Sequence, residues 1–285
     1  MIYIFLSVIC SVSVGVLIKI ARRFDIDFIQ IITLNYVSAI FLCYFSYQPE
    51  IPVGENLPWK LYIPLGILLP SVFFLLAMSV KHIGIVKTDI AQRLSLFIPV
   101  LASVFIFQEQ FTLLKIAGLA LAFVAIYFIL KRKENLENAG NNWIYPAIVL
   151  LGFGLADVLF KSLTTQSNIP YTTSLLIVFC LALAISILFS IYSILFQKKP
   201  FSFLNVAFGL FLGLLNFGNI LFYLKAHDAL SENPTTVFAS MNLGVIIAGT
   251  VIGIVFFKEK ITPKNYIGIV LAIVAIVLIT LSKLS

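Results

Sequence analysis

Long apolar runs separated by short polar segments account for almost the whole chain. Each run holds about 18 to 24 residues, which is enough to cross roughly 30 Å of hydrocarbon as an α-helix. Ten such runs are expected, at approximately 2–20, 28–47, 61–80, 87–107, 113–130, 143–162, 171–196, 203–225, 233–257 and 264–283. The pattern predicts an all-α integral membrane protein with ten transmembrane helices.

One stretch of this pattern occurs twice. The segment Phe105–Leu130 aligns without a gap to Val255–Thr280, 150 positions later. The identical pairs are Phe107/Phe257, Glu109/Glu259, Thr112/Thr262, Gly118/Gly268, Leu121/Leu271, Ala122/Ala272, Val124/Val274, Ala125/Ala275, Ile126/Ile276 and Ile129/Ile279. In each copy an apolar helix ends near a glutamate, the chain turns, and a second apolar helix follows. Because internal repeats outrank local propensity as evidence for architecture, we predict a duplicated helical hairpin.

The repetition extends to the start of each half, where Lys19 falls opposite Lys161 at a spacing of 142. We therefore divide the chain into a first five-helix repeat at residues 1–133, a linker at 134–142 and a second five-helix repeat at 143–285. An odd number of spans leaves the chain on the opposite side of the membrane, so the repeats are predicted to be inverted. Inverted repeats are typical of secondary transporters, whose binding sites lie near the midplane between the repeats.

The composition indicates lipid as the main solvent. Hydrophobic residues make up 61% and charged residues 11% of the chain, against roughly 25% charged residues in soluble domains. The net charge of +7 comes from basic residues in ones, twos and threes at helix ends, which argues against nucleic acid as a partner. Cys10, Cys43 and Cys180 lie inside apolar runs without the spacing of a disulfide framework or a zinc site, so no metal is predicted.

Lysine and arginine are distributed unevenly between the two sides of the predicted bundle. The loops after odd-numbered spans carry Arg22, Arg23, Lys81, Lys87, Lys131, Arg132, Lys133, Lys198, Lys199, Lys258, Lys260 and Lys264. The other side carries Lys60, Lys115, Lys161, Lys225 and Lys283. Because cytoplasmic loops are enriched in lysine and arginine, this bias predicts that both termini lie outside the cytoplasm.

In its motifs, the chain resembles the EamA-type proteins of the drug/metabolite transporter superfamily. The resemblance rests on Glu109, Thr112 and Gly118 with their repeats 150 positions later, and on the lysines that end the first helix of each repeat. It covers the whole chain and implies a multi-pass carrier or exporter of small metabolites, such as amino acids, in the bacterial inner membrane. It also implies a central cavity lined by the first, third and fourth helices of each repeat, and no cofactor. For the termini it implies the cytoplasmic side, which is the opposite of what the lysine and arginine distribution of this chain predicts.

Polar residues inside the apolar runs are the candidates for substrate contact. A charge in the hydrocarbon region costs about 2.5 to 3.5 kcal/mol on insertion scales, so it usually faces a cavity or a partner. The fourth span carries Asp89, Gln92 and Arg93 in its first two turns. Arg93 suits a carboxylate or a phosphate, whose oxygens match the guanidinium fork. Alternatively, Asp89 and Arg93, four residues apart on one helical face, form a structural ion pair.

The ninth span begins with a similarly polar segment. The repeat spacing places Asn242 opposite Gln92, so we expect both amides to orient the substrate. Glu232 and Asn233 lie at the start of this span and are interpreted either as helix caps or as part of an anion site at a helix N-terminus.

The sixth and eighth spans add further candidates. Asn216 and Asn219 lie three residues apart on roughly one helical face, with Tyr223 four residues further on. They either orient a polar substrate or bond to a neighbouring helix. Asp157 lies deep in the sixth span, one turn before Lys161. It either exchanges a proton during transport, which would make protons the coupling ion, or forms an ion pair with Lys161.

Glycines and turn glutamates in the apolar runs are assigned structural roles. Gly118, Gly209, Gly213 and Gly268 are expected to allow close helix packing, and Gly209 and Gly213 form a small-xxx-small pattern. Glu109 and its repeat Glu259 lie at turns, where a cap or a hairpin contact is favoured over catalysis.

The expected function is a secondary transporter or exporter that moves a small polar metabolite by alternating access, as a monomer or a homodimer. An intramembrane enzyme would need a nucleophile with a base, whereas the only histidines are His82 and His227 near helix ends, and His227 with Asp228 is interpreted as a solvated loop. A non-transporting membrane assembly protein would not need the central polar residues. A flippase of a lipid-linked or amphipathic substrate is the alternative within transport, and it predicts a cavity open sideways to lipid.

Overall fold

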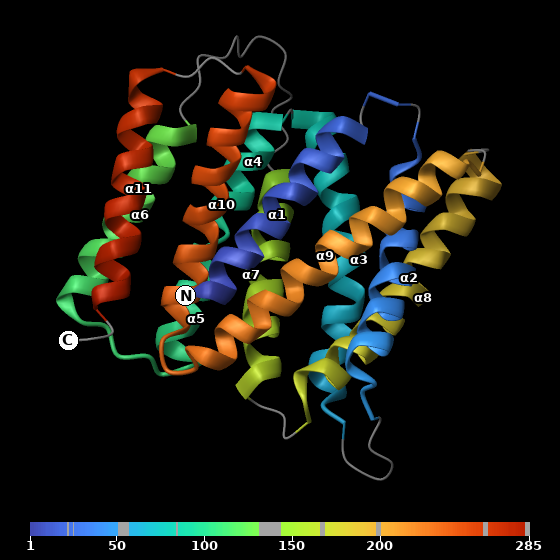
Figure 1. Ribbon diagram of the computed structural model, residues 1–285, viewed down its shortest axis with the longest axis horizontal. Coiled ribbons are helices and arrows are strands. Elements are labelled where there is room, and N and C mark those ends of the chain that lie inside the picture. The colour runs from blue at the N-terminus through green and yellow to red at the C-terminus, as the bar shows by residue number, and fades with distance from the viewer. Residues whose placement is uncertain are drawn as a thin grey trace.

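The computed structural model (Figure 1) describes residues 1–21, 23–24, 26–50, 57–83, 85–130, 144–165, 169–197, 201–258 and 262–282. Within these ranges the chain forms eleven α-helices and no strand. They are α1 (Ile2–Ala21), α2 (Phe28–Tyr47), α3 (Trp59–Ile83), α4 (Ile85–Leu94), α5 (Phe97–Phe105), α6 (Leu113–Leu130), α7 (Ile144–Thr165), α8 (Tyr171–Gln197), α9 (Phe203–Ala229), α10 (Pro234–Phe257) and α11 (Pro263–Leu281). In the same ranges ten segments are long and apolar enough to cross a membrane, so the all-α, ten-span fold is confirmed.

The fourth predicted span, 87–107, is divided into two helices, α4 and α5, rather than being one. Pro99 has no N–H to donate to the carbonyl oxygen of Ser95. That oxygen instead accepts a shorter-range bond from the N–H of Ile98, at 3.0 Å. The hydroxyl of Ser95 in turn donates to the carbonyl oxygen of Gln92, at 2.6 Å. The helix therefore breaks directly after its polar segment, which leaves α4 as a short separate element.

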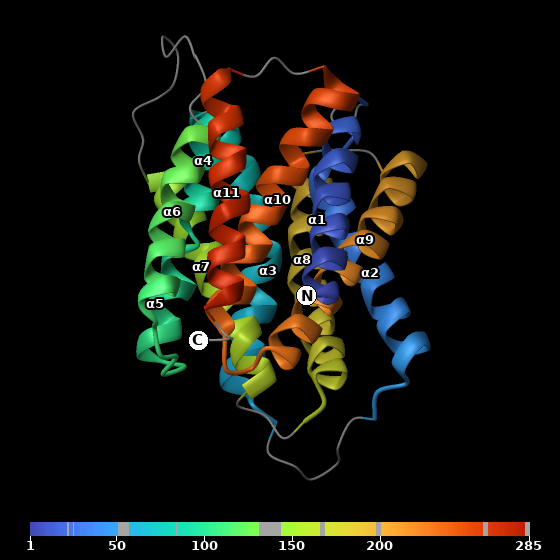
Figure 2. The same cartoon turned by 60° about the vertical axis from the view of Figure 1, so that its left-hand side comes forward.

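The two repeats run in opposite directions through the bundle (Figures 1 and 2). In Figure 1, α1 runs toward the end where α6 stops and α7 starts, which we call the linker end, whereas α7 runs away from it. The opposite end, where α5 stops and α10 starts, we call the Glu109 end, because Glu109 follows α5 in the chain. The turns after α5 and α10 share an unusual backbone conformation, since Gln108 and Lys258, 150 positions apart, both have φ of 52°. The predicted linker, 134–142, lies outside the described residues.

The duplicated hairpins contact each other through their second helices, α6 and α11. A Cβ added to Gly118 would lie 2.7 Å from Cγ1 of Ile279, and a Cβ added to Gly268 would lie 2.7 Å from Cγ1 of Ile129. Gly118 and Gly268 are repeat counterparts, and so are Ile129 and Ile279. The contact is therefore the same in both directions, which confirms the packing role predicted for these two glycines and relates the repeats by a pseudo-twofold axis.

Gly209 and Gly213 of α9 lie against α2. A Cβ added to Gly209 would lie 2.5 Å from Cβ of Leu34 and 3.0 Å from the carbonyl oxygen of Ile31. A Cβ added to Gly213 would overlap the carbonyl oxygen of Asn35 on the same helix. The small-xxx-small prediction is confirmed, because neither position has room for a side chain.

Gly213→Ala is expected to destabilise the bundle by roughly 1 to 3 kcal/mol, because the added methyl group meets backbone atoms of α2 that cannot move aside. Gly249→Ala is the matched control: Gly249 is also in a helix, and a Cβ there meets nothing within 4 Å. The control is expected to be neutral or slightly stabilising, since alanine favours helix. Thermal unfolding midpoints of the two purified variants check this, and equal midpoints would contradict the close contact.

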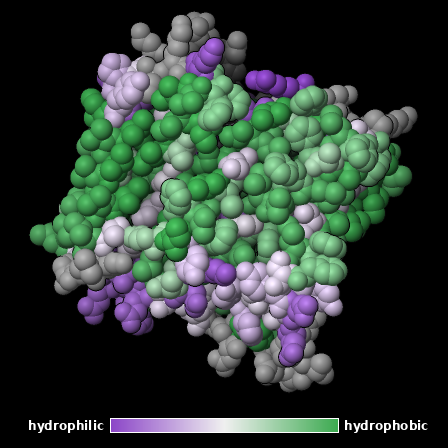
Figure 3. All heavy atoms as spheres, in the orientation of Figure 1, coloured by the Kyte–Doolittle hydropathy of each residue, from purple (hydrophilic) through white to green (hydrophobic). Residues whose placement is uncertain are grey.

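The face of the bundle seen in Figure 3 is apolar between two hydrophilic ends. Large apolar side chains are exposed on the bundle, such as Leu113 at 83% and Phe203 at 84%. Such a continuous exposed apolar surface is unfavourable in water and matches the hydrocarbon core of a bilayer. The protein is therefore a multi-pass membrane protein.

Candidate functional site

Two adjoining cavities lie in the centre of the bundle, with volumes of about 170 Å³ and 380 Å³. We call the smaller the inner cavity and the larger the outer cavity. They share the lining residues Ser11, Phe73, Gln92, Arg93, Phe153, Asn216, Asn219 and Val245. Their helical walls come from α1, α3, α4, α7, α9 and α10. These are the first, third and fourth helical spans of each repeat, as the resemblance implied.

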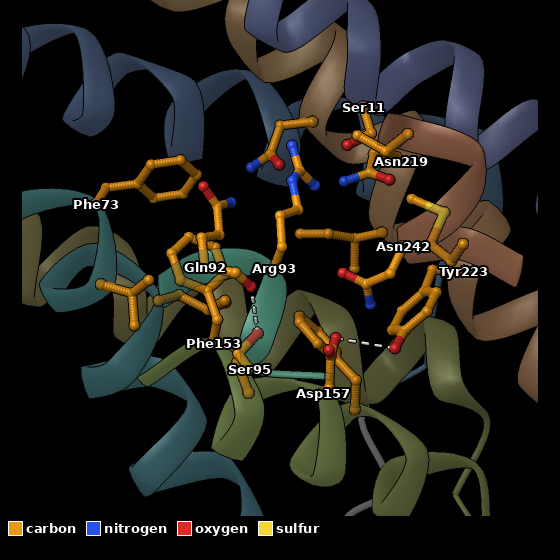
Figure 4. A pocket seen from close by; sticks show the side chains of 18 residues that line it. Ser11, Phe73, Gln92, Arg93, Ser95, Phe153, Asp157, Asn219, Tyr223 and Asn242 are labelled. Carbon is orange, nitrogen blue, oxygen red and sulfur yellow. Dashed lines mark hydrogen bonds between the residues drawn. The ribbon is translucent and has the colours of Figure 1, made fainter. Parts of the chain in front are cut away.

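All seven residues predicted to contact substrate line these cavities. Gln92, Arg93, Asp157, Asn219 and Asn242 are labelled in the view of the inner cavity in Figure 4. Gln92, Arg93, Asn216 and Asn219 line both cavities, Asp89 lines only the outer cavity, and Asp157 and Asn242 line only the inner cavity. The fold thus brings together side chains that are up to 153 positions apart, from Asp89 to Asn242. Their role in binding a substrate stays a prediction.

The outer cavity extends toward the linker end. Its lining reaches Lys19 and Phe257, the last turns of α1 and α10, where the Lys19 Nζ lies 3.8 Å from the centroid of the Phe257 ring. At the Glu109 end, Lys161 Nζ lies 5.9 Å from the centroid of the Phe107 ring. These pairs are repeat counterparts, and each joins one repeat to the other. The shorter of these two distances, that between Lys19 and Phe257, is at the linker end, toward which the outer cavity extends.

Arg93 and Asp89 form the ion pair that the sequence raised as an alternative. The Arg93 Nε lies 3.4 Å from the Asp89 Oδ1, and the two side chains are 18% and 41% exposed. Both side chains also line the outer cavity, and Arg93 extends from α4 toward the side of the cavity where Ser11 and Asn219 lie (Figure 4). The ion pair therefore lies at the cavity surface, where a bound anion can contact the guanidinium without the pair being dismantled.

Two of the amide side chains, Asn219 and Asn242, are held in place by bonds that leave part of each amide available. The Ser7 hydroxyl is shared between the carbonyl oxygen of Asn219, at 2.9 Å, and its Oδ1, at 2.8 Å. In the described residues the Asn219 Nδ2 has no partner. Asn242 donates from Nδ2 to the carbonyl oxygen of Phe238, at 3.1 Å, so its Oδ1 faces the cavity unbonded within the described part of the chain. Asn219 thus offers an amide donor and Asn242 an amide acceptor, beside the amides of Gln92 and Asn216, which line both cavities.

Asp157 is bonded to Tyr223 and not to Lys161. The Tyr223 hydroxyl donates to Asp157 Oδ1 at 2.8 Å (Figure 4). The ammonium of Lys161 is fully buried and donates to the carbonyl oxygens of Ser231, at 3.0 Å, and His227, at 3.4 Å. The predicted ion pair between Asp157 and Lys161 is therefore wrong. The reason is that carbonyl groups in the last turn of α9 and just after it, those of His227 and Ser231, lack helical partners and compete successfully for the lysine.

His227 is a core residue, which corrects the interpretation of His227 and Asp228 as a solvated loop. Its side chain is 0% exposed, and its ring centroid lies 4.6 Å from those of Tyr223 and Phe238. α9 continues to Ala229 and so carries His227 into the packed interior. Tyr223 lines the inner cavity, whereas His227 and Phe238 do not. In the described residues no group of three His, Cys, Asp or Glu side chains could hold a metal ion.

A buried polar cluster closes the Glu109 end. We define the Glu109 cluster as Glu109, Lys115, Asn233 and Thr235, which bond to one another in the interior. Asn233 occupies the N-cap position of α10, but its side chain caps nothing and accepts from Lys115 instead, so the cap prediction is wrong for Asn233. Sequence reasoning missed Lys115 as well, because it was counted among the loop lysines. The one available signal was Glu109, six residues before it in the repeated turn.

Comparisons with known proteins give a family, a close relative and a shared fold. The sequence model of the EamA-like transporter family matches residues 1–131 and again residues 142–281. An uncharacterized protein of Haemophilus influenzae is 40% identical over 282 residues, which cover 95% of this chain and 94% of the relative. A protein of known crystal structure is 14% identical and superposes with a TM-score of 0.73 over 98% of this chain and 96% of its own, which shows a shared fold. The chain belongs to the EamA-like transporter family, within the drug/metabolite transporter superfamily.

Proposed function

We propose that this protein is a secondary carrier that moves a small zwitterionic metabolite, such as an amino acid, across the bacterial inner membrane by alternating access. The observation that carries the proposal is the pairing of opposite charges in one central cavity, with Arg93 on α4 and Asp157 on α7. In this proposal the substrate carboxylate contacts Arg93, and its ammonium group contacts Asp157. The amides of Asn219 and Asn242 hold the polar part between them.

The chemistry of the two charged groups supports this orientation. A guanidinium binds a carboxylate through two parallel hydrogen bonds, and the strength of such bonds rises where water is excluded. Asp157 has a hydroxyl partner but no cationic partner in the described residues. An unpaired carboxylate in a membrane span is costly. A substrate ammonium group would neutralise it, which makes a cation the favoured ligand on that side.

The cavity shape supports alternating access. The outer cavity reaches the linker end, whereas the Glu109 end is filled by buried side chains that include Lys161, His227 and Thr235, each 0% exposed. A cavity that extends toward one end while the other end is packed is the arrangement expected of a carrier in each half of its cycle. With the uneven distribution of lysine and arginine, we place the linker end in the cytoplasm. The described state then opens toward the cytoplasm, as a carrier that takes up its cargo for export does.

Counterflow into proteoliposomes tests the substrate class. Liposomes are loaded with an unlabelled amino acid, and entry of the labelled compound is followed with its methyl ester or its N-acetyl derivative as competitors. We expect the free amino acids to compete and both derivatives to fail, because the ester loses the carboxylate for Arg93 and the acetyl derivative loses the ammonium for Asp157. An ester that competes as well as its parent would contradict the contact to Arg93.

The same assay separates the main alternative. If no water-soluble zwitterion exchanges while the protein is folded and monodisperse, a lipid-linked or amphipathic cargo becomes the better explanation. A fluorescent lipid flipping assay with the same proteoliposomes would then show movement that the empty liposomes lack.

A further inference from the structure

The carboxylate of Glu109 occupies an anion-binding site that belongs mostly to the other repeat. Its Oε2 accepts from the backbone N–H of Thr235 at 2.9 Å and from the Thr235 hydroxyl at 2.5 Å. Its Oε1 accepts from the ammonium of Lys115 at 2.8 Å. The side chains of Glu109 and Lys115 are 1% and 2% exposed. Both oxygens of the carboxylate are therefore bonded in the packed interior.

The start of α10 explains why an anion is held there. α10 is 24 residues long, begins with Pro234 and has no side-chain cap from Asn233. The first N–H groups of a helix have no partners within it, and the helix dipole favours negative charge at that end. Glu109 supplies that charge from 126 residues away. Lys115 adds a positive charge, and Lys161 also lies close enough to interact electrostatically with Glu109.

The bonds join the two repeats at the Glu109 end. Glu109 lies between α5 and α6 of the first repeat, and Thr235 is in the first turn of α10 of the second repeat. The turn is held from its own side by the Glu109 N–H, which donates to the carbonyl oxygen of Ser103 at 2.8 Å. α10 forms part of the cavity wall through Asn242, two turns further along. A movement of α10 away from α5 must therefore break the bonds of Glu109.

Two positions at the linker end differ from their counterparts in the Glu109 cluster. The repeat spacing places Asn265 opposite Lys115 and Ile85 opposite Thr235, so these two positions carry neither an ammonium group nor a hydroxyl group. Glu259, the counterpart of Glu109, lies outside the described residues. Asn265 instead accepts from the N–H of Thr262 at 2.7 Å and donates to the carbonyl oxygen of Ile129 at 2.7 Å. Within the described residues, the bonds of Asn265 therefore differ from those of its counterpart Lys115, although the sequence of the turn is repeated.

We infer that the Glu109 cluster is a lock that holds the Glu109 end closed, and that the site filled by Glu109 binds a small carboxylate when the glutamate side chain is removed. This inference rests on the proposed alternating access. In it, opening of the Glu109 end requires Glu109 to leave Thr235 and Lys115, and closing returns it. The cluster therefore sets the balance between the two states of the carrier rather than the choice of substrate.

The test uses cysteine reporters at the two ends of a cysteine-free chain in which Cys10, Cys43 and Cys180 are serine. Thr236→Cys reports on the Glu109 end, because Thr236 is 0% exposed and its hydroxyl has no partner in the structure. Ile18→Cys reports on the outer cavity, which Ile18 lines. The reaction rate of each cysteine with a methanethiosulfonate reagent is measured in lipid nanodiscs, where both ends meet solvent.

Glu109→Ala is expected to raise the reaction rate at position 236 about tenfold or more, as the loss of several bonds to a charged group predicts, and to lower it at position 18. Acetate replaces the group that the substitution removes, so added sodium acetate is expected to reverse both changes, and sodium chloride at equal ionic strength is not. Glu109→Gln fills the same space without the charge. It should shift the rates in the same direction, but acetate should not reverse them.

Glu232→Gln is the matched control, since Glu232 is exposed at the same end and forms no bond within the described residues. It is expected to leave both rates unchanged. A rise at positions 236 and 18 together would show general loosening and overturn the lock, and unchanged rates in both Glu109 variants would do the same. Rate changes that acetate leaves unaltered in Glu109→Ala would overturn the carboxylate site. These readouts need no substrate, so a silent counterflow assay would count against the proposed function and leave this test standing.

Discussion

Arg93→Ala is expected to abolish saturable counterflow of the substrate, with a loss of about a hundredfold or more in transport efficiency. Removing one partner of a desolvated charged contact typically costs roughly 2 to 5 kcal/mol. Arg93 lines both cavities, and its side chain is 18% exposed, so a carboxylate bound there would be largely shielded from water. Initial rates over a range of substrate concentrations, in proteoliposomes with equal amounts of reconstituted protein, check the prediction.

Two further variants separate substrate contact from a purely structural role for Arg93. Arg93→Lys keeps the charge but loses the fork, so partial activity with a raised KM is expected. Asp89→Asn removes the carboxylate that lies 3.4 Å from Arg93 and leaves the guanidinium in place. If Arg93 serves the substrate, Asp89→Asn retains transport, because the guanidinium has lost a competing anion. Equal damage from Arg93→Ala and Asp89→Asn would show that the pair is structural.

The bundle could be predicted because two strong signals agree in this sequence. Apolar runs of membrane-spanning length set the number of helices, and the repeat around Glu109 set their arrangement in two halves. The break between α4 and α5 was missed because residues 95–106 are almost uniformly apolar, so periodicity gives no sign of it. Pro99 was the only local signal, and its effect depends on which neighbouring N–H takes over the Ser95 carbonyl oxygen.

The lining of the cavities could also be predicted, for a thermodynamic reason. Polar groups in the hydrocarbon region must face a cavity or a partner, so the seven candidates were selected by their cost in lipid. Their partners could not be predicted in the same way. Tyr223, which bonds to Asp157, is 66 residues away from it in the sequence. Lys161 bonds to carbonyl oxygens at the end of α9 and not to Asp157, which is closer to it in the sequence. Which groups bond to each other depends on how helices from different parts of the chain are placed.

The buried lysines were misjudged for a related reason. Lys115 and Lys161 lie near the ends of apolar runs, where lysine commonly extends to the membrane surface. Here both are fully packed, and each ammonium group bonds to oxygens of the polypeptide: Lys115 to Glu109 and Asn233, and Lys161 to Ser231 and His227. The two lysines thus stabilise the closed end. Charge counts along the sequence treat them as surface residues and cannot make this distinction.

Asp157→Asn is expected to lower counterflow of a free amino acid by about a hundredfold while changing transport of an amine-free analogue much less. The substitution keeps the shape of the side chain and removes the charge that the substrate ammonium group contacts, a loss of roughly 2 to 5 kcal/mol if the contact is desolvated. Competition between an amino acid and the matching hydroxy acid, which has a hydroxyl in place of the amine, measures the effect directly. The wild type should prefer the amino acid, and the variant should lose that preference.

Tyr223→Phe is the graded control for this prediction, because it leaves the Asp157 carboxylate in place and removes only the hydroxyl that donates to it at 2.8 Å. A hydrogen bond to a charged group is worth about 1.5 to 3 kcal/mol, but part of that is recovered when the substrate ammonium group takes over the same oxygen. A smaller loss than in Asp157→Asn, with the preference for the amine preserved, is therefore expected. An equal loss of transport of the amino acid and the hydroxy acid in Asp157→Asn would contradict the contact to the substrate amine. Asp157 would then act on the cycle of the carrier, and proton exchange at this carboxylate would be the better explanation of its position beside the inner cavity.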